Sequence, residues 1–172
     1  MTKTKYLLCL SLFAAQPAFA AAASDAPAAA TAAVLPKPAA GKGQIVLFRP
    51  SSMGFAIKCT VRENGAMVGR VGAGKYYVIE VEPGLHNLTA KTEKTDAVAV
   101  QVEADETSYV KCGISMGVMV GRPNLSPSTE EEFAKSAGKI KPMESEKIAA
   151  EIEKDRAEQA AKGSTEAKGG SN

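Results

Sequence analysis

The alternation of apolar and polar positions divides the chain into a strand-rich middle and two flanking parts that lack it. Over residues 43–126, short runs of β-branched and aromatic residues are separated by turns that contain Gly, Pro or Asn. The pattern predicts about seven strands, over residues 44–48, 55–62, 67–71, 75–81, 86–91, 97–103 and 107–114. Many short strands with no helical pattern between them favour a single antiparallel β-sandwich, so the expected fold class is mainly β.

Two connections in this region carry clear turn signals. Asn64-Gly65 favours positive φ and predicts a tight hairpin. Glu82-Pro83-Gly84 predicts a second turn, because Pro presets one φ and Gly supplies the positive one. Period-two alternation also predicts which residues share a face. In the first strand these are Phe55, Ile57, Cys59 and Val61, and in the second they are Tyr77, Ile79 and Val81.

The flanking segments have a different composition. Residues 21–42 are rich in Ala and Pro, so they are expected to form a disordered linker that cannot bury enough surface to offset chain entropy. Residues 127–162 are expected to form a helical tail, and residues 163–172 a disordered C-terminus. The sandwich is thus expected to lie between an unstructured tether and helices.

Two helices are expected in the tail. Ser128 is a suitable N-cap for a first helix over residues 129–137, whose acidic first turn suits the helix dipole. A second helix is expected from near Ser145 to about Lys162. Its large apolar residues are Ile148 and Ile152, so we expect it to be solvated or weakly docked.

The first 20 residues have the order of a secretory signal peptide. Lys3 and Lys5 precede an apolar run over residues 6–15, and Ala18-Phe19-Ala20 forms a small-x-small cleavage site. We therefore expect cleavage after Ala20 and export to the periplasm or cell envelope. The run is shorter than the roughly 20 residues of a membrane span, so no transmembrane span is expected in the mature protein.

Removal of this signal changes the charge and the cysteine count. The two signal lysines account for the whole-chain charge of +2, so residues 21–172 are neutral. Without a basic excess, binding to nucleic acid is not expected. Cys9 would leave with the signal, and residues 6–8 before it lack the small residue that lipoprotein processing requires.

Cys59 and Cys112 remain as a pair. Each shares strand parity with apolar residues, so both side chains are expected to point into the core. In an oxidising compartment they would form a disulfide if their strands are neighbours or face each other. The alternative is two separate buried thiols.

Catalytic and metal-binding patterns are missing from the sequence. His86 is the single histidine, and we expect it to order its turn by hydrogen bonding to the backbone. No Gly-x-Ser-x-Gly motif occurs, and the glycine-rich residues 69–74 lack the Lys-Ser pair of a phosphate-binding loop. We therefore expect no catalytic residues, no cofactor and no metal.

Residues 114–127 form a methionine-rich, glycine-punctuated run that has two interpretations. Flexible Met side chains suit adaptable apolar surfaces, which predicts a loop that contacts a partner or lipid. Its candidate contact residues are Met116, Met119, Arg122, Asn124 and Leu125. The alternative is one more strand, with a loop folded back over the end of the sandwich.

Four short motifs connect the middle of the chain with a known family. They are Phe48-Arg49-Pro50, residues 64–69, Pro83-Gly84-x-His86 and Gly121-Arg122-Pro123-x-Leu125. About half of the chain resembles the bacterial exported proteins grouped as domain of unknown function 2846, and is more distantly similar to PEGA-type β-modules. The resemblance implies an envelope-associated β-sandwich module, often signal-bearing or lipid-anchored, without an established activity.

Three functions follow as hypotheses. The first is a non-enzymatic, exported cell-envelope β-module that binds or scaffolds another envelope protein or an envelope surface. The second is an enzyme that acts on an envelope glycan or another polymer, which would need two carboxylates facing one cleft. The third is a purely structural envelope protein. The oligomeric state is left open.

Overall fold

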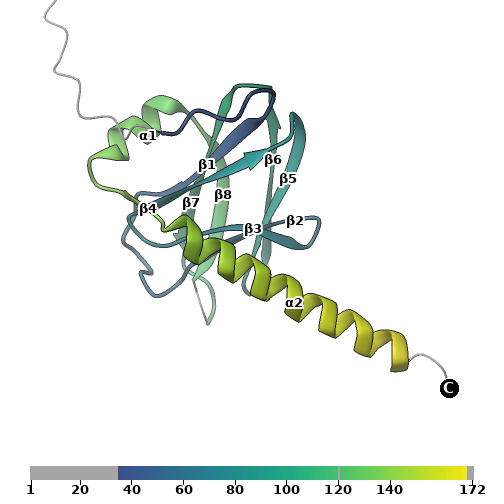
Figure 1. Cartoon of the computed structure of the whole chain (residues 1–172). Helices are drawn as coiled ribbons and strands as arrows, with labels where there is room; N and C mark the ends of the chain where they lie inside the picture. The colour runs from purple at the N-terminus through teal and green to yellow at the C-terminus, as the bar shows by residue number, and fades with distance from the viewer. Residues whose placement is uncertain (1–34, 120, 170–172) are drawn as a thin grey trace, which may run out of the picture.

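The computed structural model describes residues 35–119 and 121–169, and this part of the chain forms two β-sheets and two helices (Figure 1). The expected signal peptide and most of the expected linker lie outside the described residues. The strands are β1 (Gly43–Arg49), β2 (Cys59–Glu63), β3 (Ala66–Val71), β4 (Lys75–Val81), β5 (Gly84–Lys91), β6 (Thr95–Val102), β7 (Thr107–Ser115), β8 (Arg122–Ser128) and β9 (Lys141–Pro142). The helices are α1 (Glu130–Ala137) and α2 (Ser145–Gly169).

The two sheets form the expected sandwich. One sheet has the strand order β8-β7-β1-β4-β9, and the other has the order β3-β2-β5-β6. Most pairs are antiparallel, but β1 pairs in parallel with β7, and β4 pairs in parallel with the short strand β9. The strand count exceeds the expected one because β8 and β9 add to the larger sheet.

Strand β1 is central to the packing because all seven of its residues are buried. Ile45 and Leu47 face the core between the sheets, together with Val61, Leu88 and Val110. Its other face packs beneath α1 in a second cluster. This cluster consists of Val46, Phe48, Tyr76, Phe133 and Ile140. Burial of both faces explains why this strand shows a continuous apolar run.

The helices cover different parts of the sandwich (Figure 1). The N-cap of α1 is Thr129, whose hydroxyl accepts from the Glu132 amide at 3.3 Å; the expected cap was the preceding Ser128. Helix α2 packs on β3 with Ile148 buried, so it is docked where a weak or absent contact was expected. It continues to Gly169, past the expected end near Lys162.

Two segments differ from the sequence pattern. Residues 35–42, which the pattern assigns to the linker, lie against the larger sheet; Pro36 accepts a hydrogen bond from the Gln44 side chain at 2.9 Å. The strand expected to begin at Phe55 begins at Cys59. Phe55 is 81% exposed, because residues 50–58 form the connection between the two sheets and cannot pair with either.

Candidate functional site

The candidate site lies at one end of the sandwich and is built from two loops. Because β1 and β7 are parallel neighbours, the loops that follow them leave from the same end, toward the lower left of Figure 1. We call residues 51–57 and 116–119 the apolar loop pair. The turn between β5 and β6 lies at the same end. Its Glu93 carboxylate accepts from the backbone amides of Val118 at 3.0 Å and Met119 at 2.7 Å.

The loop pair concentrates the exposed apolar side chains of the described residues. Large hydrophobic side chains are exposed by 69% at Met53, 81% at Phe55, 95% at Met116, 85% at Val118 and 89% at Met119. The other large exposed hydrophobic side chain in the described part of the chain is Leu85, at the opposite end of the sandwich. A cluster of this kind marks a binding surface more often than isolated apolar residues do.

Arg49 holds the first loop from inside the protein. Its side chain is fully buried, and its guanidinium donates to the backbone oxygens of Met53 and Ile57 and, at 2.9 Å, to that of Gly54. Burial lowers the pKa of Arg49 from its ordinary value. The three carbonyl oxygens satisfy the two terminal nitrogens, while the buried Nε has no hydrogen-bond partner among the described residues. The shape of the loop therefore depends on this side chain.

The two loops are packed against each other at their bases. A Cβ atom at Gly121 would lie 2.5 Å from Ile57 Cδ1 and 2.7 Å from Ile114 Cγ2, so a larger residue there would displace these side chains. Gly54 has φ +64° and also lies over Ile114. The loop pair therefore forms one surface although its halves are far apart in the sequence.

A disulfide connects the strands that carry the loop pair. Cys59 begins β2, directly after the first loop, and Cys112 lies near the end of β7, shortly before the second. The bond joins the two sheets with a Cα–Cα distance of 6.6 Å. The pairing confirms the disulfide predicted from strand parity.

Basic and acidic side chains both lie beside the loop pair. The cations are Lys58, Lys91, Lys94 and Arg122, of which Lys58 pairs with Glu151 at 3.6 Å and Arg122 pairs with Glu93 at 3.2 Å. The carboxylates of Glu93 and Asp96 are turned onto backbone amides, Glu93 onto those of Val118 and Met119 and Asp96 onto that of Leu125. At the opposite end, five acidic residues outnumber two lysines, Lys37 and Lys42, of which Lys42 pairs with Glu82; the acidic residues are Glu80, Glu82, Glu103, Asp105 and Glu106.

The predicted contact residues divide into two groups. Met116 and Met119 lie on the second loop and are exposed. Arg122, Asn124 and Leu125 belong to β8, and Leu125 is buried in the core, so it cannot contact a partner. The run thus contains both an exposed loop at residues 116–119 and one more strand, β8, while contact of the loop with a partner stays a prediction. Met53 and Phe55 were missed, although Ser51, Ser52 and Gly54 beside them favour a loop over a strand.

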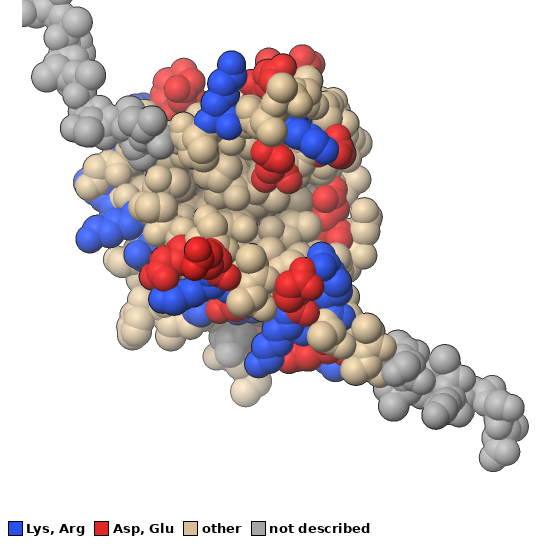
Figure 2. All heavy atoms as spheres, viewed as in Figure 1, with Lys and Arg blue, Asp and Glu red and all other residues tan. Residues whose placement is uncertain are grey.

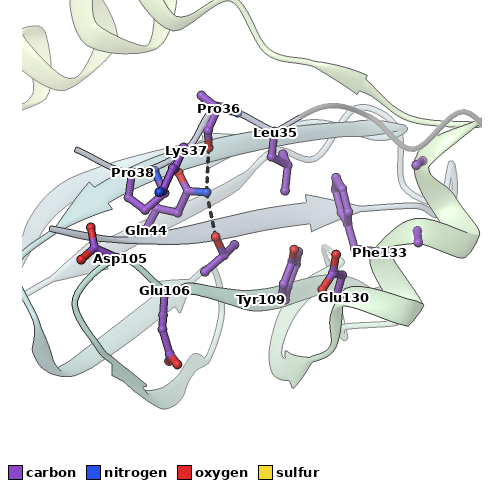
Figure 3. A pocket seen from close by; sticks show the side chains of 13 residues that line it. Leu35, Pro36, Lys37, Pro38, Gln44, Asp105, Glu106, Tyr109, Glu130 and Phe133 are labelled. Carbon is purple, nitrogen blue, oxygen red and sulfur yellow. Dashed lines mark hydrogen bonds between the residues drawn. The ribbon is translucent and has the colours of Figure 1, made fainter. Parts of the chain in front are cut away.

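A hollow of about 570 Å³ lies elsewhere, between the 35–38 segment, the start of β7 and helix α1 (Figure 3). Gln44 lines it, and its amide donates to Pro36 and to the Thr107 hydroxyl at 2.8 Å. In Figure 3 the carboxylates of Asp105 and Glu130 stand at opposite ends of the hollow, and Glu106 points away. The hollow therefore does not place two carboxylates face to face, as glycoside hydrolysis requires.

Tyr109 stands between the hollow and helix α1. Burial raises its pKa above the ordinary value, and the carboxylates of Glu130 and Glu131 raise it further. At neutral pH the phenol is therefore protonated, and its ring packs against that of Phe133 with the centroids 5.5 Å apart.

His86 lies at the acidic end and has the structural role expected from its turn. Its Nε2 is 2.8 Å from the Glu82 backbone oxygen, and its Nδ1 is 2.9 Å from Glu63 Oε1. Within residues 35–119 and 121–169, no group of three or more His, Cys, Asp or Glu residues could hold a metal ion.

Charge and hydropathy are distributed unevenly over the surface. Figure 2 shows red and blue spheres side by side along α2, where acidic and basic side chains alternate. None of the helices that the structure describes is long and apolar enough to cross a membrane. Among the described residues, the apolar loop pair holds most of the large hydrophobic side chains that are exposed.

Comparison with known proteins identifies a family but no activity. Residues 39–123 match the family described as "Protein of unknown function (DUF2846)", which confirms the resemblance seen in the motifs. The chain is similar to an uncharacterized protein of Haemophilus influenzae, with 23% identity over 111 residues. The alignment covers 64% of this chain and 66% of the relative, just under two thirds of the relative's length. No solved structure matches.

Proposed function

Residues 39–123 match the DUF2846 family, whose function is unknown. We propose a function from the surface of the protein, namely that it is a non-enzymatic binding module of the cell envelope. It contacts its partner through the apolar loop pair. The observation that carries the proposal is the exposure of five large apolar side chains on two loops that are held in place. Such exposure in an unbound protein favours a surface that becomes covered.

The fixed geometry of the loops supports a binding role. Arg49 fixes the first loop from inside, and Glu93 fixes the second through two amides. A loop held in this way loses little conformational freedom when it binds, which favours affinity. Exposed side chains on loops without such contacts would be weaker evidence for a binding surface.

The cell-envelope location is part of the proposal and rests on the N-terminal sequence. Lys3, Lys5 and the small residues at Ala18 and Ala20 have signal-peptide spacing. The mature chain would begin at Ala21, outside the cytoplasm. N-terminal sequencing of the native protein tests this directly, and a chain that still begins at Met1 in the cytosolic fraction would contradict it.

The binding role is tested by fractionation of cells that express surface variants. We expect the double variant M116S/M119S to move the protein from the envelope fraction to the soluble fraction. Leu85→Ser is the matched control, because Leu85 is also an exposed apolar residue but lies at the opposite end. Equal retention of the wild type and the double variant would contradict the proposed surface.

A further inference from the structure

The chemistry around the apolar loop pair identifies the class of its partner. We propose that the loop pair inserts into the surface of an anionic phospholipid bilayer. This inference rests on the proposed binding function and names the partner of the same surface.

The shape of the surface suits lipid better than protein. Met53, Phe55, Met116 and Met119 project from two separate loops and are each more than two thirds exposed. A protein partner would need a complementary, close-packed patch around such protruding groups. A bilayer needs none, because acyl chains and headgroups rearrange around inserted side chains, and the affinity grows with the apolar area buried.

The charges beside the loops select an anionic surface. Lys91 and Lys94 belong to the turn that holds the second loop, whose Glu93 carboxylate is turned inward onto the loop amides. Lys58 and Arg122 lie at the same end and pair with Glu151 and Glu93. The long stems of these cations can pack beside inserted side chains while their charged ends reach phosphate groups. Lysine and arginine beside a membrane are attracted to anionic headgroups.

The opposite end of the molecule carries an excess of acid. Glu80, Glu82, Glu103, Asp105 and Glu106 lie there, against two lysines, Lys37 and Lys42, of which Lys42 pairs with Glu82. In a chain without net charge over residues 21–172, most of the large exposed apolar side chains of the described residues thus lie at the end away from this acidic excess. This distribution orients the protein with the loop pair toward an anionic bilayer.

The test uses the protein purified from cells with its native N-terminus and measures sedimentation with lipid vesicles. One vesicle preparation contains phosphatidylglycerol and phosphatidylethanolamine in equal parts, and the other contains phosphatidylcholine alone. We expect binding to the first, a loss of binding in high salt, and at least about tenfold weaker binding to the second.

Variants assign the binding to the proposed residues. M116S/M119S should weaken binding at least about tenfold, because it removes two inserted apolar side chains. K91E/K94E should weaken it at least as much at low salt. Leu85→Ser is the matched control and should bind like the wild type. Unchanged melting temperatures establish that the variants are folded.

The possible outcomes separate this inference from the function on which it rests. Vesicle binding that depends on both variant pairs supports it. Binding that is absent, or equal on both vesicle types, overturns it. A photo-crosslinking residue at position 119 then decides the rest. A protein adduct that forms with the wild-type lysines and is lost in K91E/K94E would support the binding function with a protein as the partner. The absence of any adduct would contradict both the bilayer inference and the binding function.

Discussion

At the scale of the residue, Arg49 has a role that the hydropathy pattern does not predict. A charged side chain at the end of a strand is expected to face solvent, but this one is completely buried. It replaces solvation with three backbone carbonyl oxygens of the following loop. The Phe48-Arg49-Pro50 motif that carries part of the family resemblance thus has a physical explanation, because it closes the strand and shapes the loop.

Substitution of Arg49 should therefore destabilise the protein. Arg49→Met keeps most of the side-chain volume but removes the donor to the carbonyl oxygens of Met53 and Ile57, while that of Gly54 still accepts from the Ile57 amide at 2.9 Å. We therefore expect a loss of about 2–4 kcal/mol in the free energy of unfolding. Urea unfolding measures it. Arg49→Lys keeps the charge and should cost less. A loss below about 0.5 kcal/mol for Arg49→Met would contradict the role given to Arg49.

At the scale of the element, local signals succeeded where the chain pairs with its sequence neighbours. Asn64 and Gly65 have φ values of 50° and 85° and form the predicted hairpin, and β4 has the predicted bounds. The strand expected at Phe55 was wrong in its first half, because alternation does not reveal where the chain crosses between sheets. Strand β9 was missed because two residues pair only through the tertiary fold.

The candidate site was predictable to a similar extent. The second loop was recognised from Met116 and Met119, whose type is unusual for a turn. The first loop was hidden by the apparent alternation at Phe55, and its support by Arg49 depends on burial that no local pattern records. The docking of α2 was also underestimated, since ion pairs to Arg62 on β2 and Arg70 on β3 supplement its thin apolar stripe.

Helix α2 offers a packing prediction. Ile148 is 1% exposed, so Ile148→Ala should lower the free energy of unfolding by about 2–3 kcal/mol through lost burial and a residual cavity. Ile152 is partly exposed, and Ile152→Ala should cost less. Thermal or urea unfolding of both variants checks the order. Equal, small losses would mean that α2 is not docked in solution.

The same helix gives the stability a dependence on pH. Hydrogen bonding to Arg62, at 2.7 Å, lowers the pKa of Asp155 below its ordinary value of 3.8. A carboxylate with a lowered folded-state pKa stabilises the fold above the unfolded value, and this contribution is lost as the pH falls through the folded value. The wild type should therefore exceed Asp155→Asn in stability by a constant amount above about pH 5, and the difference should shrink below pH 3.8.

Urea unfolding over a series of pH values measures this difference. Glu153→Gln is a suitable control on the same helix, because Glu153 pairs with Arg156 within the helix and not with the sandwich. A difference between wild type and Asp155→Asn that stays constant down to pH 2 would rule out the linkage.

At the scale of the whole molecule, the disulfide joins the two sheets over a sequence separation of 53 residues. The chain-entropy model assigns a loop of this size about 4 kcal/mol, with many measured cases smaller. We expect reduction, or C59A/C112A, to lower the melting temperature clearly. Mass spectrometry after alkylation without reductant checks the bond itself, and two alkylated cysteines in the folded, exported protein would refute it.

The position of this bond, at the base of both loops, has a consequence for when the protein becomes competent. In a reducing cytosol β2 and β7 would have no covalent link, and the two halves of the surface would rest on separate sheets held by noncovalent contacts alone. Oxidation after export would complete the scaffold that brings Met53 and Phe55 beside Met116 and Met119. If the chain is exported as proposed, the covalent support of the surface would thus be completed only after synthesis, in the oxidising compartment.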